Sequence, residues 1–141
     1  MLNQTNLWAI TNCLQSQQST KTLLLTTKVV VSLLKDSDTK IADSLLKINF
    51  IKTLAQCKGT QEIRMNVLRI AIKLLEAQPG PYCQDEFRLS GFLDMCFEQL
   101  RQITKINHND DELKFYFTEV VRLVVDANMA SCEAALEQGY Q

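Results

Sequence analysis

The sequence predicts an all-α protein built from pairs of helices that stack on one another. One observation is a near-repeat, in which Leu33 and Leu34 correspond to Leu74 and Leu75, and Phe50 corresponds to Phe92. Another is composition, since the chain contains only two prolines and four glycines, which permits long uninterrupted helices. A period of about 40 residues with two helices in each unit is typical of stacked helix-pair arrays.

The N-terminal third of the chain predicts two helices. The first covers about residues 6–14 and is followed by a polar loop. Residues 21–35 are ambiguous, because residues 22–31 are rich in β-branched side chains, which favour strands. A helix is favoured there, since a lone strand among helices would lack partners for its backbone groups. Ser19 or Thr20 is expected to cap this helix.

Two longer helices are predicted in the middle of the chain. The first runs from a turn at residues 36–39 to Lys58 and Gly59, and its apolar face is wide enough for burial against more than one neighbour. Thr60 opens the second, whose apolar residues follow the helical period and which ends before the Pro-Gly-Pro sequence at residues 79–81. Its polar stripe is formed by Glu62, Asn66, Arg69, Lys73 and Glu76.

The C-terminal half predicts three more helices, for a total of about seven and no strand. One covers residues 85–106, with Leu89 in its buried row and Gly91 inside it, where the close approach of a crossing helix would explain a glycine. Its solvent stripe holds Asp94, Glu98, Arg101, Gln102 and Lys105. The others cover about residues 110–126 and, as a short last helix, residues 131–137.

The period, the helix pairing and the matched apolar positions of residues 20–128 resemble the armadillo and HEAT family of helical repeats. The Pro-containing first helix and the Asp-Arg signature of many HEAT units are missing from the sequence. The resemblance implies a right-handed superhelix of about three helix pairs with a concave protein-binding surface. Residues 1–141 are expected to form one domain, with a terminal piece of a longer solenoid as the alternative.

The residues that carry chemistry in proteins do not form a recognisable motif. Five isolated cysteines show neither a C-x-x-C pair nor zinc spacing, which is typical of small buried side chains in a reducing compartment: Cys13, Cys57, Cys83, Cys96 and Cys132. His108 is the only histidine, and there is no glycine-rich phosphate loop. We therefore expect no enzyme activity, no metal ion and no cofactor.

Charge and hydropathy limit the partners and the location. Fifteen basic and sixteen acidic residues leave a net charge of −1, which provides no global field to attract nucleic acid or an anionic membrane. No apolar run approaches the ~18 residues that a membrane span requires, and no signal sequence opens the chain. These features predict an intracellular protein, cytoplasmic or nuclear, without membrane contact.

Basic residues concentrate between positions 47 and 73, where Glu62 is the only acid. Five of them are candidate partner-binding residues, two on the helix before Thr60 and three on the helix after it: Lys47, Lys52, Arg64, Arg69 and Lys73. The functional interpretation is a site for an acidic peptide or a phosphate backbone. The simpler interpretation is a set of solvated polar stripes that keep the surface soluble.

The expected function is a non-catalytic interaction scaffold that captures a helix or extended peptide of another protein on a face built from the second helices of successive units. The first alternative is a helical bundle that assembles with itself, because wide apolar faces surround Phe50 and Ile51 and residues 115–117. Nucleic-acid binding through the basic face is the second alternative. The candidate exposed anchors are Trp8, Phe115, Tyr116 and Tyr140.

Overall fold

A computed structural model describes residues 9–14, 19–34, 39–48, 50–57, 59–106 and 111–138. These residues form helices joined by turns and include no strand, which confirms the all-α prediction. A short helical stretch at residues 9–12 precedes eight labelled helices. Their bounds are α2 Thr20–Leu33, α3 Thr39–Lys47, α4 Phe50–Gln56, α5 Gln61–Ala77, α6 Pro81–Leu89, α7 Phe92–Ile106, α8 Asp111–Val125 and α9 Met129–Glu137.

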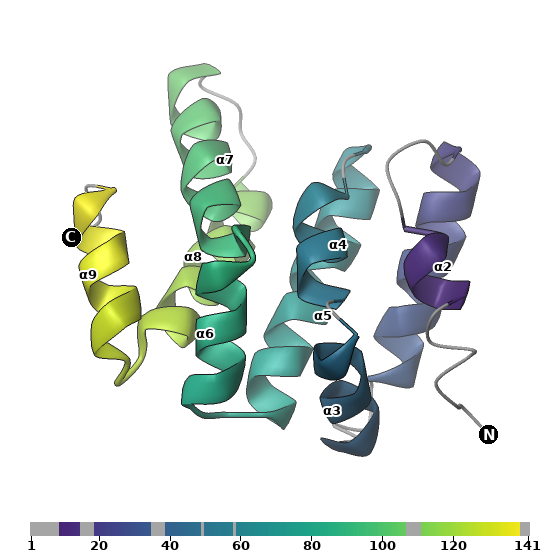
Figure 1. Ribbon diagram of the computed structural model, residues 1–141. Coiled ribbons are helices and arrows are strands. Elements are labelled where there is room, and N and C mark those ends of the chain that lie inside the picture. Colours follow the sequence, from purple (N-terminus) through teal and green to yellow (C-terminus); the bar gives the residue numbers. More distant parts are fainter. Residues whose placement is uncertain are drawn as a thin grey trace.

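The helices lie in two layers (Figure 1). Helices α2, α5 and α8 form what we call the first layer, in which α5 makes its most extensive contacts with α2 and with α8. The second layer holds α3, α4, α6, α7 and α9, where α4 contacts α7 and α6 contacts α9. Along the chain, α3 and α4 connect α2 to α5, α6 and α7 connect α5 to α8, and α9 follows α8.

The near-repeat of the sequence corresponds to equivalent points of the second layer. Phe50 is the first residue of α4 and Phe92 the first residue of α7, and both side chains are fully buried. The first-layer helices are not evenly spaced along the chain, because the interval from the start of α5 to the start of α8 is longer than the interval from α2 to α5. Helix α7 has 15 residues where α4 has 7, so two extra turns of α7 account for most of the difference.

The single helix predicted from residue 39 to residue 58 is wrong, because the structure breaks it between α3 and α4. At the end of α3 the N–H of Ile48 donates to the carbonyl of Leu45 at 3.3 Å, the tightened last turn of a helix. In a straight helix at 3.6 residues per turn, the buried side chains would spread around most of the circumference. The break lets both rows face the core: Ala42, Leu45, Leu46 and Ile48 in one, Phe50, Ile51 and Leu54 in the other.

The single helix predicted over residues 85–106 is also wrong, because it is two helices that meet at Gly91. Gly91 has φ +89°, a conformation that side chains rarely adopt, and a Cβ added there would meet nothing within 4 Å. The glycine is therefore explained by backbone conformation and not by a crossing helix. Leu89, expected in the buried row, is the last residue of α6 and is 71% exposed. The break shifts the helical register, so Leu89 does not share a face with the buried residues of α7.

The predicted helix starts agree with the structure at two caps. The hydroxyl of Ser19 accepts the N–H of Thr22 at 3.2 Å, and α2 is a helix despite its β-branched residues. The hydroxyl of Thr60 accepts the N–H of Ile63 at 3.4 Å at the start of α5. Helix α6 begins earlier than expected, at Pro81, where a missing N–H costs nothing.

Candidate functional site

Three of the five cysteine side chains lie in the core. Cys57, Cys83 and Cys96 are buried, Cys13 and Cys132 are half-buried, and all five thiols are free. Burial raises the pKa of Cys83 to about 12 and also raises the pKa of Cys57 and Cys96. Because the thiolate is the nucleophile, these three side chains stay protonated and unreactive at neutral pH.

The residues that the structure describes include neither a candidate metal site nor a candidate membrane span. No group of three or more His, Cys, Asp or Glu side chains among these residues could hold a metal ion. No helix formed by them is long and apolar enough to cross a membrane. His108, Trp8 and Tyr140 lie outside the described residues.

The predicted partner-binding residues of α5 do not lie on one face. Arg64 and Arg69 are five positions apart, which places them about 140° apart around the helix axis. Arg64 is exposed and lines a pocket against α4 and α7, whereas Arg69 is half-buried toward Asn66 and Tyr116. Lys73 is half-buried as well. Arg64 and Arg69 therefore do not belong to a single basic patch.

The other two predicted residues belong to the second layer. Lys47 is exposed at the end of α3, and its ammonium lies 2.9 Å from the carboxylate of Asp43 one turn earlier. This contact raises the pKa of Lys47. Lys52 is exposed on α4. The two lysines therefore belong to α3 and α4 of the second layer, whereas the three predicted residues of α5 belong to the first layer.

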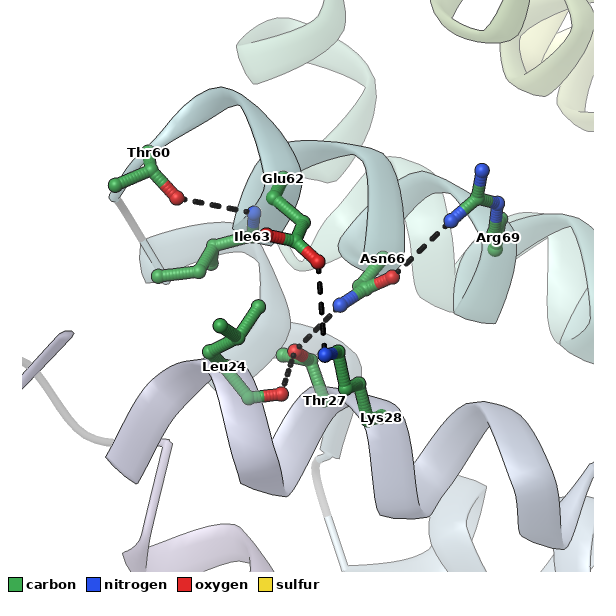
Figure 2. A network of polar contacts seen from close by, with 8 residues as sticks. All are labelled: Leu24, Thr27, Lys28, Thr60, Glu62, Ile63, Asn66 and Arg69. Carbon is green, nitrogen blue, oxygen red and sulfur yellow. Dashed lines mark hydrogen bonds and ion pairs between the residues drawn. The ribbon is translucent and has the colours of Figure 1, made fainter. Parts of the chain in front are cut away.

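A polar network joins α2 to α5 (Figure 2). Asn66, expected in the solvent stripe of α5, is only 4% exposed, and its Nδ2 donates to Oγ1 of Thr27 at 3.1 Å. The Thr27 hydroxyl donates in turn to the carbonyl of Leu24 at 3.0 Å. Beside them, Lys28 and Glu62 form an ion pair at 3.6 Å. The burial of Asn66 follows from its partner on another helix, far away in the sequence.

Arg69 extends this network toward α8. Its Nη1 donates to Oδ1 of Asn66 at 3.2 Å, so the Asn66 amide is bonded at both ends. The guanidinium carbon also lies 6.0 Å from the centre of the Tyr116 ring, within the range of a cation–π contact. Arg69 thus contacts side chains of both α5 and α8, which gives it a structural role in the first layer.

A shallow groove of about 870 Å³, largely open to solvent, crosses the second layer. It is lined by residues of α4, of the Gly91 turn, of α7 and of the end of α9: Ala55, Gln56, Gly91, Asp94, Met95, Glu98, Arg101 and Gln138. None of the five predicted basic residues lines it. The acidic residues in its wall were expected to be an ordinary solvent stripe, and only the packing of α4 and α9 beside α7 makes that stripe the wall of a groove.

A small pocket adjoins the groove and shares Ala55 and Met95 with it. Its volume is about 100 Å³, smaller than the ~150 Å³ of an engineered apolar cavity that holds one benzene molecule. The lining is apolar except for Arg64 and Gln99, and consists of Ala55, Cys57, Gly59, Arg64, Val67, Leu68, Met95, Gln99 and Phe117. The pocket therefore has room for a single apolar side chain and opens beside the groove.

The wall of the groove carries a net negative charge. Arg101 donates to Oε2 of Glu98 at 3.0 Å and to Oε1 of Gln138 at 3.1 Å. The amide of Gln138 donates to Oδ1 of Asp94 at 3.2 Å. Arg101 thus neutralises Glu98, whereas none of the ion pairs found among the described residues includes Asp94.

The apolar surfaces expected to drive self-assembly are mostly interior. Phe50, Ile51 and Phe117 are at most 2% exposed and belong to the core, so they are not available for contact with another chain. Phe115 is 63% exposed and packs edge-on against Tyr116, with ring centres 5.7 Å apart. Of the predicted anchors within the described residues, only Phe115 is a large exposed apolar side chain.

No protein-family model, curated protein or solved structure matches this chain. The function is therefore inferred from the groove, the pocket and the arrangement of the two layers.

Proposed function

We propose that this chain is a non-catalytic interaction module that binds a helix or extended peptide of another protein along the groove across α4, α7 and α9. The supporting observation is that the groove and the apolar pocket adjoin and share Ala55 and Met95. Peptide-binding proteins commonly combine a groove with a pocket that takes an apolar anchor, and such anchors provide most of the binding energy.

The proposal includes the architecture of a helix-pair array of the armadillo and HEAT type with a right-handed superhelical path. Its support is the separation of α2, α5 and α8 from the second layer, together with the equivalent positions of Phe50 and Phe92 at the starts of α4 and α7. In such arrays each unit contacts its neighbours, and successive units create an extended binding surface. The groove crosses α4 and α7, which are equivalent elements of two successive units in this scheme.

Within this proposal the basic residues have different roles. Arg64 lines the pocket, and Lys52 lies one turn before Gln56 on α4, so a partner in the groove would meet these two. Arg69 serves the first layer through Asn66 and Tyr116. We therefore expect reversal of charge at Arg64 to affect binding more than reversal at Arg69.

A second candidate function is self-association through α9. Met129 and Leu136 are 79% and 65% exposed, and their spacing of two helical turns places them on the same side of the helix. Sedimentation over a concentration series tests this candidate, since a strict monomer at all concentrations excludes it.

The test of the proposed function is affinity capture from a cell extract with three versions of the whole chain as bait. Ala55→Leu fills the junction of groove and pocket, and Ala130→Leu makes the same change at an exposed position of α9. A protein recovered with the native chain and with Ala130→Leu, but lost with Ala55→Leu, supports binding in the groove. Equal recovery with all three baits contradicts it.

A further inference from the structure

We infer that copies of this chain associate head to tail, with the exposed face of α9 in one copy packed against the exposed face of α2 in the next. This inference rests on the second candidate function, self-association through α9, and names the surface that α9 contacts. It does not depend on the groove.

Helices α2 and α9 lie at opposite ends of the array that the described residues form (Figure 1). Inside the array a helix has neighbours on both sides, as α5 has in α2 and α8. Helix α2 packs on α5, and α9 packs on α6 and α8, so each of these end helices has one side that faces away from the array. In stacked helix arrays the outer faces of the terminal units are normally polar, because they meet water.

The outer faces of α2 and α9 are not fully polar. On α2, Leu25 and Val29 lie one turn apart and are 54% and 49% exposed. On α9, Met129 and Leu136 lie two turns apart and are exposed as well. Four of the large apolar side chains that are exposed among the described residues thus belong to the end helices, and the others belong to α6 and α8: Tyr82, Leu89 and Phe115. Each end offers an apolar strip that contact with another helix would remove from water.

The charge beside the strip of α2 is positive. Helix α2 contains two lysines and no acidic residue. Lys21 lies one turn before Leu25, and Lys28 lies next to Val29, and both lysines are exposed. Lys28 is paired with Glu62 of α5 at 3.6 Å, whereas none of the ion pairs found among the described residues includes Lys21.

The charge beside the strip of α9 is negative. Helix α9 contains Glu133 and Glu137 and no basic residue, and both glutamates are exposed on the side of Met129 and Leu136. Neither glutamate belongs to an ion pair found among the described residues. Arg101 of α7 reaches the end of α9 at Gln138, but its guanidinium is paired with Glu98. The two end faces are therefore complementary in charge.

This complementarity selects a contact between different ends of two copies. Two α9 faces in contact would oppose glutamates, and two α2 faces would oppose lysines, and like charges in contact weaken association. A contact between α9 and α2 brings unlike charges together and covers both apolar strips. Such a contact is heterologous, so each added copy leaves one α2 face and one α9 face free, and association can continue beyond a dimer. Because one helix of each copy takes part, we expect weak association in the upper micromolar range.

The experiment is sedimentation of the whole chain at concentrations up to about 1 mM and about 0.15 M salt. All changes are made at exposed positions. The α2 variant carries Lys21→Glu and Leu25→Glu, the α9 variant carries Glu133→Lys and Leu136→Lys, and the control on α6, between the two ends, carries Tyr82→Glu and Leu89→Glu.

The two end variants should each associate at least about tenfold more weakly than the native chain, and the control should associate as the native chain does. An equimolar mixture of the two end variants should regain association, because the α2 variant keeps a native α9 face and the α9 variant keeps a native α2 face. A mixture that stays monomeric overturns the inference.

A second measurement does not depend on the folding of any variant. In the native chain labelled at methionine and valine methyl groups, the NMR signals of Met129 and Val29 should shift as the concentration rises. The signals of Met65 and Val67, which are buried, should stay unchanged. A shift of Met129 without a shift of Val29 overturns the inference, because it indicates a contact between two α9 faces.

The outcomes separate the inference from the second candidate function. An α2 variant that associates as the native chain does, with loss of association in the α9 variant, overturns the inference but leaves self-association through α9. A native chain that is monomeric at all concentrations overturns both. Association of both end variants at the native strength, or its loss in the control, shows that the two strips are not the interface and also overturns both.

Discussion

The two layers of this molecule are built differently. First-layer helices α2, α5 and α8 are continuous over 14 to 17 residues, and side chains such as Asn66 and Arg69 connect them. In the second layer, the segment between α2 and α5 and the segment between α5 and α8 each form two helices, with breaks near residue 48 and at Gly91. The groove lies at the second break, where Gly91 is part of its wall. The comparison teaches that continuous helices joined by polar side chains form one layer, whereas the breaks of the other layer leave room for a groove.

The largest effect is expected where the second layer enters the core. Phe92 begins α7, is fully buried and packs edge-on against Phe87 with ring centres 5.0 Å apart. Phe92→Ala should lower the free energy of unfolding by about 3–5 kcal/mol, measured by chemical denaturation. Phe115→Ala, at an exposed position of α8, should change it by less than about 0.5 kcal/mol. Similar losses for both would show that Phe92 is not buried between the elements described.

The next effect tests the connection within the first layer. Asn66→Ala removes the bonds to Thr27 and Arg69 and should lower the free energy of unfolding by about 1–3 kcal/mol. In the background of Thr27→Val the same change should cost less, because the two side chains are directly bonded. Thermal or chemical unfolding of the four proteins gives the coupling. Additive effects would mean that the bond between Thr27 and Asn66 does not stabilise the contact between α2 and α5.

The break in the second layer can be tested at Gly91. Gly91→Ala forces a side chain into φ +89° and should lower the free energy of unfolding by about 1–2 kcal/mol, although the added Cβ meets nothing within 4 Å. Leu89→Ala, at a position of α6 that is 71% exposed, is the control and should have little effect. A neutral or stabilising Gly91→Ala would indicate that α6 and α7 form one helix.

Burial of thiols predicts loss of stability at alkaline pH. The pKa of Cys83 is raised to about 12 in the folded chain from an ordinary value near 9.0, so above pH 9 the unfolded chain releases a proton that the folded chain keeps. The contribution of Cys83 is therefore complete below pH 9 and lost as the pH rises toward 12. Unfolding measured at pH 9 and pH 10 should differ by roughly 1 kcal/mol from this group. Cys83→Ala should flatten the dependence, and an unchanged slope would contradict it.

The smallest effect separates the two arginines of α5. Arg69→Ala removes the contact with Tyr116 and the bond to Asn66, and should lower the free energy of unfolding by about 0.5–1 kcal/mol. Arg64→Ala, at an exposed position, should leave stability unchanged but alter binding in the pocket. Equal stabilities for the two variants would remove the structural role given to Arg69.

Local sequence signals predicted much of the fold. Ser19 and Thr60 were recognised as caps because capping depends on the residues of one turn, and the apolar period located α5 and α8. The two breaks in the second layer were not predicted. The break near residue 48 depends on which sides of α3 and α4 face the core, and that is decided by their packing. Gly91 was noticed, but its left-handed conformation is a property of the turn that only the structure shows.

The candidate site was less predictable. Ala55 and Met95 are far apart in the sequence, so the pocket between them exists only after α4 packs against α7. The burial of Asn66 likewise depends on Thr27. The placement of Arg64 and Arg69 on different faces of α5 could have been predicted from the sequence, because residues five positions apart on a helix do not share a face.

The central claim is that a partner other than a second copy binds the second layer and not the first. Hydrogen–deuterium exchange of the chain, with and without a protein recovered by affinity capture with the native chain, tests it most directly. The account predicts slower exchange at residues 50–57 and 91–101, around the groove, and unchanged exchange on α2 and at residues 62–73 of α5. Protection centred on residues 62–73, with none at residues 91–101, would contradict it and return the binding surface to the first layer.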